Sequence, residues 1–209
     1  MKCASIRMRS ILWAGVLVAV TLTSEAALHE RPGGMVYDDV QDITWLQDWD
    51  MDGLMDWDTA NDWANNLVYG GYSDWRLPTS VNADGSEPCL GFSCAGSEMG
   101  YIFYQYVGGK AFESILDPTG DTADEIANLA LFTNVRSFAY WSGTEYAPDP
   151  NVAWLFYTNV GQQVNFVVKA SAVNAVAVRA GDVSAVPEPE TVALMVVGLG
   201  ALGLVARRR

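Results

Sequence analysis

The spacing of hydrophobic and polar positions predicts one well-defined helix in the first third of the chain. Its apolar positions are spaced i, i+3, i+4 and i+7, which places them on one face of an amphipathic helix: Ala60, Trp63, Ala64 and Leu67. Asp56 or Asp58 can accept the free amide hydrogens of the first turn, and the glycines at 70–71 can end the element. We therefore expect a helix over residues 57–67.

Two further helices are indicated by weaker patterns. Apolar residues again recur at helical spacing after a candidate cap at Ser97: Met99, Ile102, Phe103 and Tyr106. Thr122 and Glu125 have the spacing of a capping box, which predicts a short third helix.

Strand-like patterns fill most of the remaining chain. Residues 35–37 and 43–46 form two short apolar runs, and four longer runs of aromatic and β-branched residues follow at 138–142, 153–158, 163–169 and 175–179. The loop at 159–162 predicts a hairpin between the middle pair. In the third of these runs the alternation places the more apolar side chains on one face: Val164, Phe166 and Val168. The predicted fold is α+β, an antiparallel sheet with two or three short helices at one side.

The N-terminal residues have the three parts of a secretory signal peptide. A basic start with Lys2 precedes an apolar run at 11–22, and small residues precede Ala27. A membrane anchor is the alternative, but twelve residues span only about 18 Å of a hydrocarbon layer roughly 30 Å thick. We expect residues 1–26 to be removed and Ala27 to begin the mature protein.

The C-terminal residues 184–209 contain three elements in a fixed order. Val186, Pro187, Glu188 and Pro189 precede an apolar run at 192–206, and three arginines end the chain. This arrangement resembles a PEP-CTERM sorting signal. The resemblance implies a Gram-negative bacterium, export through the inner membrane, transient anchoring by the C-terminal segment, and processing by an exosortase-type membrane protease. The protein would then be at the cell surface or secreted. An ordinary C-terminal anchor is the alternative.

Length and charge limit what lies between these ends. A chain of 209 residues, half of them hydrophobic, can bury one good-sized core, so residues 27–183 are expected to form a single domain. Residues 27–186 carry six basic and 22 acidic side chains. This imbalance argues against nucleic acid as a partner, and it is consistent either with solubility or with a need for cations.

Two cysteines remain once the signal peptide is removed. Cys89 and Cys94 lie in a loop rich in glycine and serine, in a chain expected to reach an oxidising compartment. We therefore predict a disulfide between them.

The aspartates before the first helix suggest a cation loop. Their spacing, with Gly53 between them, repeats the first nine positions of an EF-hand: Asp48, Asp50, Asp52 and Asp56. The twelfth position holds Thr59 in place of the bidentate glutamate. Two interpretations stay open: a calcium site completed by another carboxylate, or a solvated acidic turn that caps the helix.

The tryptophans are divided between core and surface. Trp49 and Trp57 are flanked by aspartates, so we expect them to be exposed and available to contact a ligand. The others are expected to fill the core: Trp45, Trp63, Trp75, Trp141 and Trp154. Arg76 is expected to pair with a nearby carboxylate.

Several of these segments together resemble a known domain family. They are the helix and the following Gly-Gly-Tyr-Ser-Asp and Trp-Arg-Leu-Pro-Thr runs at 57–79, with the shorter matches 37–38, 44–45, 140–144 and 177–179. They are similar to the family named for the C-terminal domain of the Legionella collagen-like protein. The resemblance implies a C-type-lectin-like fold and, for the named protein, adhesion to glycosaminoglycans.

The residues give little support for catalysis. His29 is the only histidine, and it lies close to the expected mature start, so no serine–histidine or cysteine–histidine pair is indicated. The predicted function is a non-enzymatic binding module of the cell surface or extracellular matrix, contacting polysaccharide or a surface protein. The alternatives are a structural matrix protein without a discrete ligand and a secreted glycoside hydrolase that uses two carboxylates.

Overall fold

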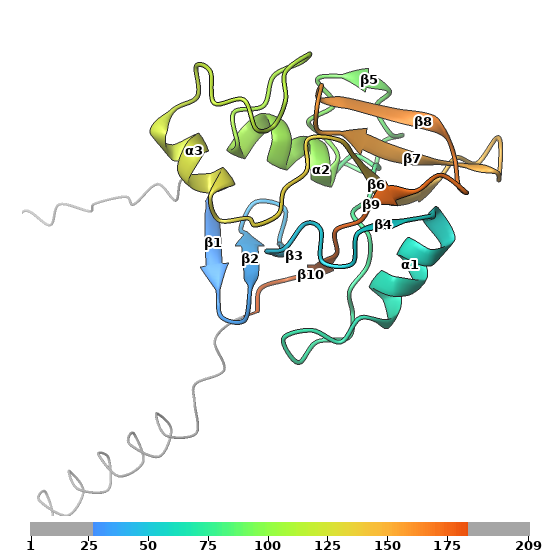
Figure 1. Ribbon diagram of the computed structural model, residues 1–209, viewed down its shortest axis with the longest axis horizontal. Helices are drawn as coiled ribbons and strands as arrows, with labels where there is room; N and C mark the ends of the chain where they lie inside the picture. The colour runs from blue at the N-terminus through green and yellow to red at the C-terminus, as the bar shows by residue number, and fades with distance from the viewer. Residues whose placement is uncertain (1–26, 184–209) are drawn as a thin grey trace, which may run out of the picture.

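The computed structural model describes residues 27–183, which form an α+β domain built on two sheets (Figure 1). This confirms the predicted α+β class, with two sheets where one was predicted, while the C-type-lectin-like fold stays a prediction. The predicted signal peptide at 1–26 and the sorting segment at 184–209 lie outside the described residues. Within residues 27–183, no helix is long and apolar enough to cross a membrane.

The smaller sheet contains the beginning and the end of the described chain. Its strands are antiparallel in the order β1-β2-β3-β10, namely β1 Leu28–Arg31, β2 Met35–Asp38, β3 Ile43–Leu46 and β10 Val178–Ala180. Strands β2 and β3 were predicted from their apolar pattern. Strand β1 was not, because its sequence Leu-His-Glu-Arg has one apolar residue and its partner β2 supplies the stabilisation.

The larger sheet is built around the β7–β8 hairpin. The strand order is β4-β9-β6-β7-β8-β5, and only the β6–β9 pair is parallel. The strands are β4 Leu54–Met55, β5 Gly91–Phe92, β6 Ala139–Glu145, β7 Val152–Tyr157, β8 Gln162–Val168 and β9 Val173–Asn174. The hairpin prediction is confirmed. The two-residue strands β4, β5 and β9 are too short to produce a periodic signal.

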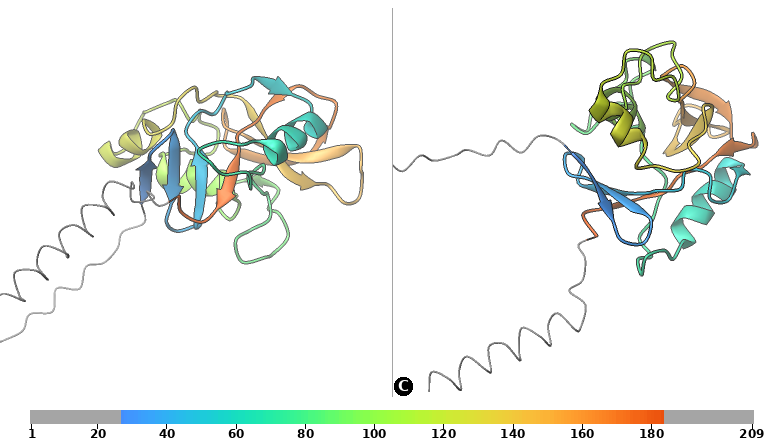
Figure 2. Two further views of the ribbon diagram at one scale, coloured as in Figure 1. Left: turned by 90° about the horizontal axis from the view of Figure 1, so that it is seen from below. Right: turned by 60° about the vertical axis from the view of Figure 1, so that its left-hand side comes forward.

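Three short α-helices and one π-helical segment complete the domain: α1 Trp57–Asn66, α2 Glu98–Tyr101, η1 Ile102–Tyr106 and α3 Ala123–Leu129. The predicted caps are present, since Asp56, Ser97 and Thr122 each accept a backbone amide hydrogen of the first turn. The change to π-helix after Tyr101 was not predicted. Figure 2 shows α1 beside the larger sheet, well apart from α3.

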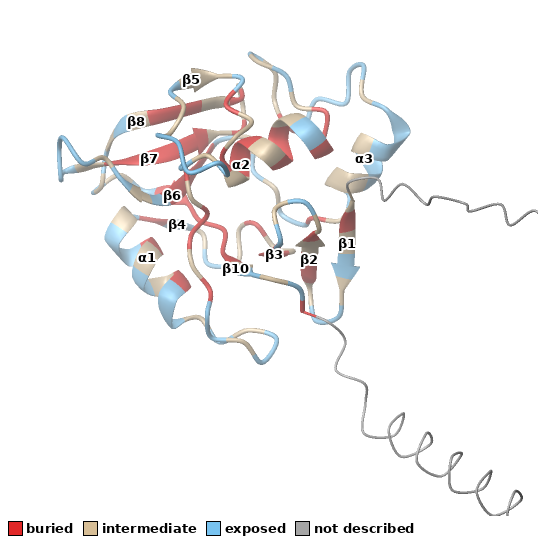
Figure 3. Ribbon diagram, turned by 180° about the vertical axis from the view of Figure 1, so that it is seen from behind, coloured by how far each residue is buried: buried red, intermediate tan, exposed pale blue. Residues whose placement is uncertain are grey.

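One continuous core joins the two sheets. Trp45, Trp49, Trp75 and Trp141 are at most 2% exposed, and Trp154 is also buried. Trp49 contacts a residue of each sheet. Its ring centroid lies 5.7 Å from that of Trp45 on β3 and 5.4 Å from that of Tyr140 on β6. The core prediction is confirmed for Trp45, Trp75, Trp141 and Trp154. It is not met by Trp63, which is only partly buried at the core margin. The outer side of α1 and most of α3 face solvent (Figure 3).

The predicted apolar face of β8 is wrong. Val164 is fully buried, whereas Phe166 is 65% exposed and Val168 is 54% exposed. The pairing with β7 explains the difference, because Ala153 pairs with Val167 and Leu155 pairs with Val164. Strand β8 therefore has one residue more than β7 over this interval, and this bulge turns the later side chains to the opposite face.

Substitutions on β8 test the bulge. We expect Val164→Ala to lower the free energy of unfolding by about 2 kcal/mol, because it removes buried methyl groups from a packed core. Phe166→Ser, on the solvent side, should change it by less than about 0.5 kcal/mol. Urea unfolding followed by tryptophan fluorescence measures both values. Similar losses from the two substitutions would mean that both side chains face the core and that the bulge is absent.

Candidate functional site

A cleft of about 440 Å³ lies where helix α1, the segment after Trp75 and strand β6 meet. It is lined by Asn61, Arg76, Leu77, Thr79, Gly143 and Thr144. The volume is within the range of small-ligand sites. The lining residues come from three parts of the chain, so the cleft exists only in the folded domain.

Helix α1 supplies Asn61 and is fixed at both its start and its inner face. Asp56 accepts a hydrogen bond from the Thr59 amide at 2.8 Å, which begins the helix, and Ala60 and Ala64 are fully buried against the core. The Asn61 side-chain amide donates to the carbonyl of Trp57 at 2.9 Å. The Asn61 side chain is therefore oriented by its own helix.

Arg76 is fixed by Glu98 on the neighbouring helix α2. Its Nη1 and Nη2 atoms lie 2.8 and 2.6 Å from the two carboxylate oxygens of Glu98, which also accept the amide hydrogen of Thr79 at 2.7 Å. This confirms that Arg76 pairs with a carboxylate. The Glu98 side chain raises the pKa of the Arg76 guanidinium above its usual value, so the guanidinium stays charged. The Glu98 carboxylate balances that charge.

Strand β6 closes the other side of the cleft. The Gly143 amide donates to the carbonyl of Pro78 at 2.9 Å, and the Thr144 hydroxyl lies 3.1 Å from that of Thr79. Thr144 also accepts the amide hydrogen of Ser80 at 3.0 Å. The cleft thus presents hydroxyl and amide groups, with one guanidinium whose charge is balanced.

The four aspartates of the predicted cation loop each have another partner. Asp48 accepts from the Asp50 amide and from the Asn134 side chain, both at 3.0 Å, while Asp50 forms an ion pair with Arg136 at 2.6 Å. The remaining two, Asp52 and Asp56, accept hydrogen bonds from the Trp63 ring and from the first turn of α1.

No metal-binding group emerges from this arrangement. Within residues 27–183, no group of three or more acidic, histidine or cysteine side chains is placed to hold a metal ion. The hydrogen bond from the Thr59 amide lowers the pKa of Asp56, as expected for a helix cap. These contacts match the capping interpretation of the aspartates, and calcium binding stays a prediction.

The two tryptophans expected at the surface behave differently. Trp49 is fully buried, so its predicted exposure is wrong: its ring packs against Trp45, Phe132 and Tyr140. The aspartates on either side are bonded to Asn134 and Arg136. Trp57 is partly buried, and its ring nitrogen donates to the carbonyl of Ser142 at 2.8 Å.

The aromatic face of Trp57 is already covered by a cation. The Nζ atom of Lys169 lies 4.0 Å from the centroid of the Trp57 ring. Trp57 therefore supports the cleft through Ser142, which precedes Gly143, and does not line it. Asn61 was missed by the sequence reasoning, because its polar side chain follows the outward pattern of any amphipathic helix.

The predicted disulfide is present. Cys89 and Cys94 are bonded, with their Cα atoms 5.4 Å apart. The loop is also attached to the larger sheet, because the Gln163 side chain donates to the carbonyl of Cys89 at 2.7 Å. The sorting residues Val186, Pro187, Glu188 and Pro189 lie outside the described residues.

Calcium dependence separates the two interpretations of the aspartate loop. We expect the melting midpoint to be the same in millimolar calcium and in chelator, because Asp50 would have to leave Arg136 before it could bind a cation. If the loop binds calcium, a free calcium concentration one hundred times the dissociation constant would add about 2.7 kcal/mol to the free energy of unfolding. The melting midpoint would then rise by several degrees. Such a rise, if removed by replacing Asp50 and Asp52 with asparagine, would establish the calcium site and exclude the capping interpretation.

Comparison with known proteins identifies the C-terminal segment. Residues 185–209 match the PEP-CTERM protein-sorting motif, which implies export and a membrane-associated tail, and such motifs are recognised by exosortases. No curated protein matches the chain. The sorting signal predicted from the ordered Pro-Glu-Pro, apolar and arginine elements is therefore confirmed.

Proposed function

We propose that this protein is an exported binding module, without enzymatic activity, whose cleft at Asn61, Arg76 and Gly143 holds a neutral polysaccharide of the cell surface or extracellular matrix. The observation that carries the proposal is the lining of the cleft, in which amide and hydroxyl groups converge on one hollow. Sugar hydroxyls both donate and accept hydrogen bonds, and such groups complement them without a charge.

The electrostatics favour a neutral ligand. The chain has a formal net charge of −13, so an anionic polysaccharide is repelled at long range. The guanidinium of Arg76 does not reverse this, because Glu98 neutralises it through two hydrogen bonds. Adhesion to glycosaminoglycans, implied by the lectin-like resemblance, is therefore not part of the proposal.

The lining also favours binding over hydrolysis. Glycoside hydrolysis ordinarily needs two carboxyl groups on either side of the bond that breaks. Among the described residues that line the cleft, none is an aspartate or a glutamate. A structural matrix protein without a ligand is the remaining alternative, and the binding experiment distinguishes it.

Two substitutions in the cleft test the proposal against a panel of immobilised neutral glucans, galactans and mannans. We expect the exported protein to bind one of them saturably. Asn61→Ala should weaken binding about three- to tenfold, the loss expected for one hydrogen bond. Gly143→Ala should also weaken it, since the new methyl group would lie 3.4 Å from Leu77 and 3.5 Å from Asn61 and would reduce the cleft without a clash.

Asn65→Ala is the matched control, because Asn65 is an exposed asparagine of the same helix outside the cleft. Isothermal titration with the polysaccharide identified by the panel gives the affinities. Absence of saturable binding to every neutral glycan would refute the proposal, as would equal affinities for the Asn61 and Asn65 variants. Saturable capture of an envelope protein in place of a glycan would favour the surface-protein alternative.

The sorting motif predicts processing of the tail. We expect intact-mass measurement of protein recovered from the native host to show a chain that ends near residues 186–189. Replacing the residues at 187–189 by alanine should leave the tail attached, because the recognised motif is lost. Glu190→Ala, just after the Pro-Glu-Pro triplet, should be processed normally. A wild-type mass that includes residues 207–209 would contradict processing.

A further inference from the structure

Ala27 and Asp39 form a reciprocal pair at the edge of the smaller sheet. The backbone N–H of Ala27 donates to a carboxylate oxygen of Asp39 at 2.9 Å, and the Asp39 amide donates to the Ala27 carbonyl at 3.3 Å. The other carboxylate oxygen lies 3.1 Å from the ring nitrogen of His29 on β1. One carboxylate thus contacts two groups of the first three residues that the structure describes.

Ala27 is also the predicted first residue of the mature protein. Hydrolysis of the 26–27 peptide bond adds water across it: the carbonyl side becomes a carboxylic acid and Ala27 gains a free amine. At neutral pH that amine binds a proton and becomes an ammonium group with three N–H donors. We propose that Asp39 is the binding site for this new ammonium group, so that signal-peptide cleavage converts a neutral hydrogen bond into an ion pair.

The surroundings of Ala27 favour a positive charge. Ala27 lines a hollow of about 510 Å³ between β1, η1 and α3, together with Tyr101, Tyr106, Asp124 and Glu125 among others. The charged and titratable groups near the new amine are the two tyrosines, the carboxylates of Asp38, Asp39, Asp124 and Glu125, and His29. The Asp39 carboxylate, whose pKa is lowered by the Ala27 N–H, contacts this amine directly, so the amine binds its proton more tightly here than in water.

The position of Ala27 makes the pair relevant to stability. Strand β1 is an edge strand that pairs only with β2 in its sheet, so no strand is hydrogen-bonded to its other edge within that sheet. The ion pair would hold the residue that directly precedes that strand. The proposal goes beyond the binding function, because it concerns what export does to the fold and does not depend on any glycan.

The expected pH dependence follows from two groups. The Ala27 N–H, followed by His29, lowers the pKa of Asp39, so the stabilisation is present above the ordinary carboxyl range near pH 4 and is lost as the pH falls through the lowered value. The pKa of the ammonium group shifts in the opposite direction. Its pKa is raised by Asp39, so its contribution is complete below about pH 7.7 and is lost as the pH rises further.

Selective acetylation of the α-amine tests the proposal on the exported protein. Acetylation keeps an N–H on Ala27 but removes the charge, which reproduces the amide of the uncleaved chain. We expect the free amine to melt roughly 2 °C higher than the acetylated protein at pH 7, with the difference vanishing by pH 10.

Charge-removing variants locate the effect. Asp39→Asn should abolish the difference between free and acetylated protein, whereas Asp62→Asn, at an exposed position on α1, should preserve it. Should the Asp39 variant fail to fold, titration of the Ala27 amine by NMR in the wild type decides the matter, with a pKa above 8 expected. Equal melting of free and acetylated wild type, a pKa at or below 8, or a mature protein that begins elsewhere would each overturn the proposal.

Discussion

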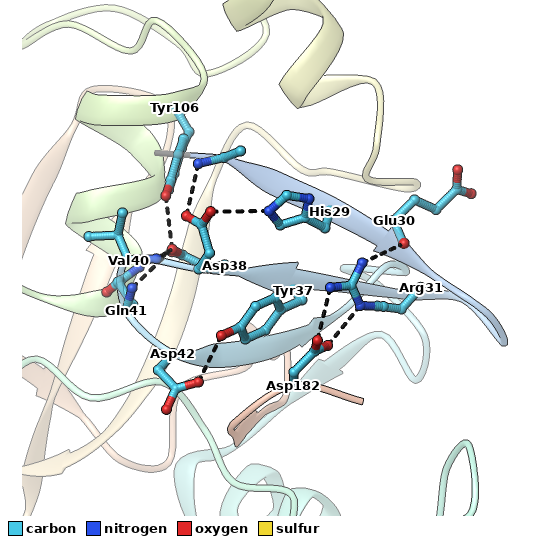
Figure 4. Close-up of polar contacts among 12 residues, drawn as sticks. His29, Glu30, Arg31, Tyr37, Asp38, Val40, Gln41, Asp42, Tyr106 and Asp182 are labelled. Carbon is cyan, nitrogen blue, oxygen red and sulfur yellow. Dashed lines mark hydrogen bonds and ion pairs between the residues drawn. The ribbon is translucent and has the colours of Figure 1, made fainter. Parts of the chain in front are cut away.

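The fold depends on satisfying one fully buried carboxylate, that of Asp38 at the end of β2. One of its oxygens accepts from the amides of Val40 and Gln41, both at 3.0 Å, and from the Tyr106 hydroxyl at 2.9 Å. The other accepts from the Gln41 side chain at 2.7 Å. A buried polar group without such partners costs a few kcal/mol. These four donors therefore compensate the burial of the Asp38 side chain, and they join the β2–β3 turn to the π-helical segment (Figure 4).

The same polar network continues toward the candidate cleft. Gln41 reaches the carbonyl of Glu98 at 3.4 Å, and the Glu98 carboxylate holds the side chain of Arg76. Arg76 in turn exchanges two backbone hydrogen bonds, each of 2.8 Å, with Val178 on β10. The segment that forms one side of the cleft is thus bonded to both a helix and a sheet edge. These bonds restrain the segment, which would limit the entropy lost in the binding that we propose.

Structural features that depend on neighbouring residues were predicted well from the sequence. Features that depend on a partner far along the chain were not. The helix caps at Asp56 and Ser97 act within four residues, so spacing alone identified them. The burial of Trp49 depends on Phe132 and Tyr140, more than 80 residues away, and the aspartates beside it gave the opposite indication. The bulge in β8 likewise exists only through its pairing with β7.

The candidate site shows the same division. The Arg76 and Thr144 segments were singled out by resemblance, while Asn61 was not, because nothing local distinguishes it from Asn65 on the same helix. The aspartate loop is the clearest case of a local pattern with more than one outcome. Asp50 takes Arg136 as its partner from 86 residues along the chain, and no spacing within the loop could have indicated that choice.

The two ends of the described chain are joined in the smaller sheet. Arg31 on β1 pairs with Asp182 at 2.7 Å, so residues close to both ends of the described range lie at one place. Strands β1 and β10 occupy opposite edges of the smaller sheet, and the cleft segment adds to the β10 edge through Arg76. Figures 1 and 2 show β1 and α1 on opposite sides of this sheet. The proposed cleft therefore lies at the β10 edge of the smaller sheet, opposite the edge formed by β1.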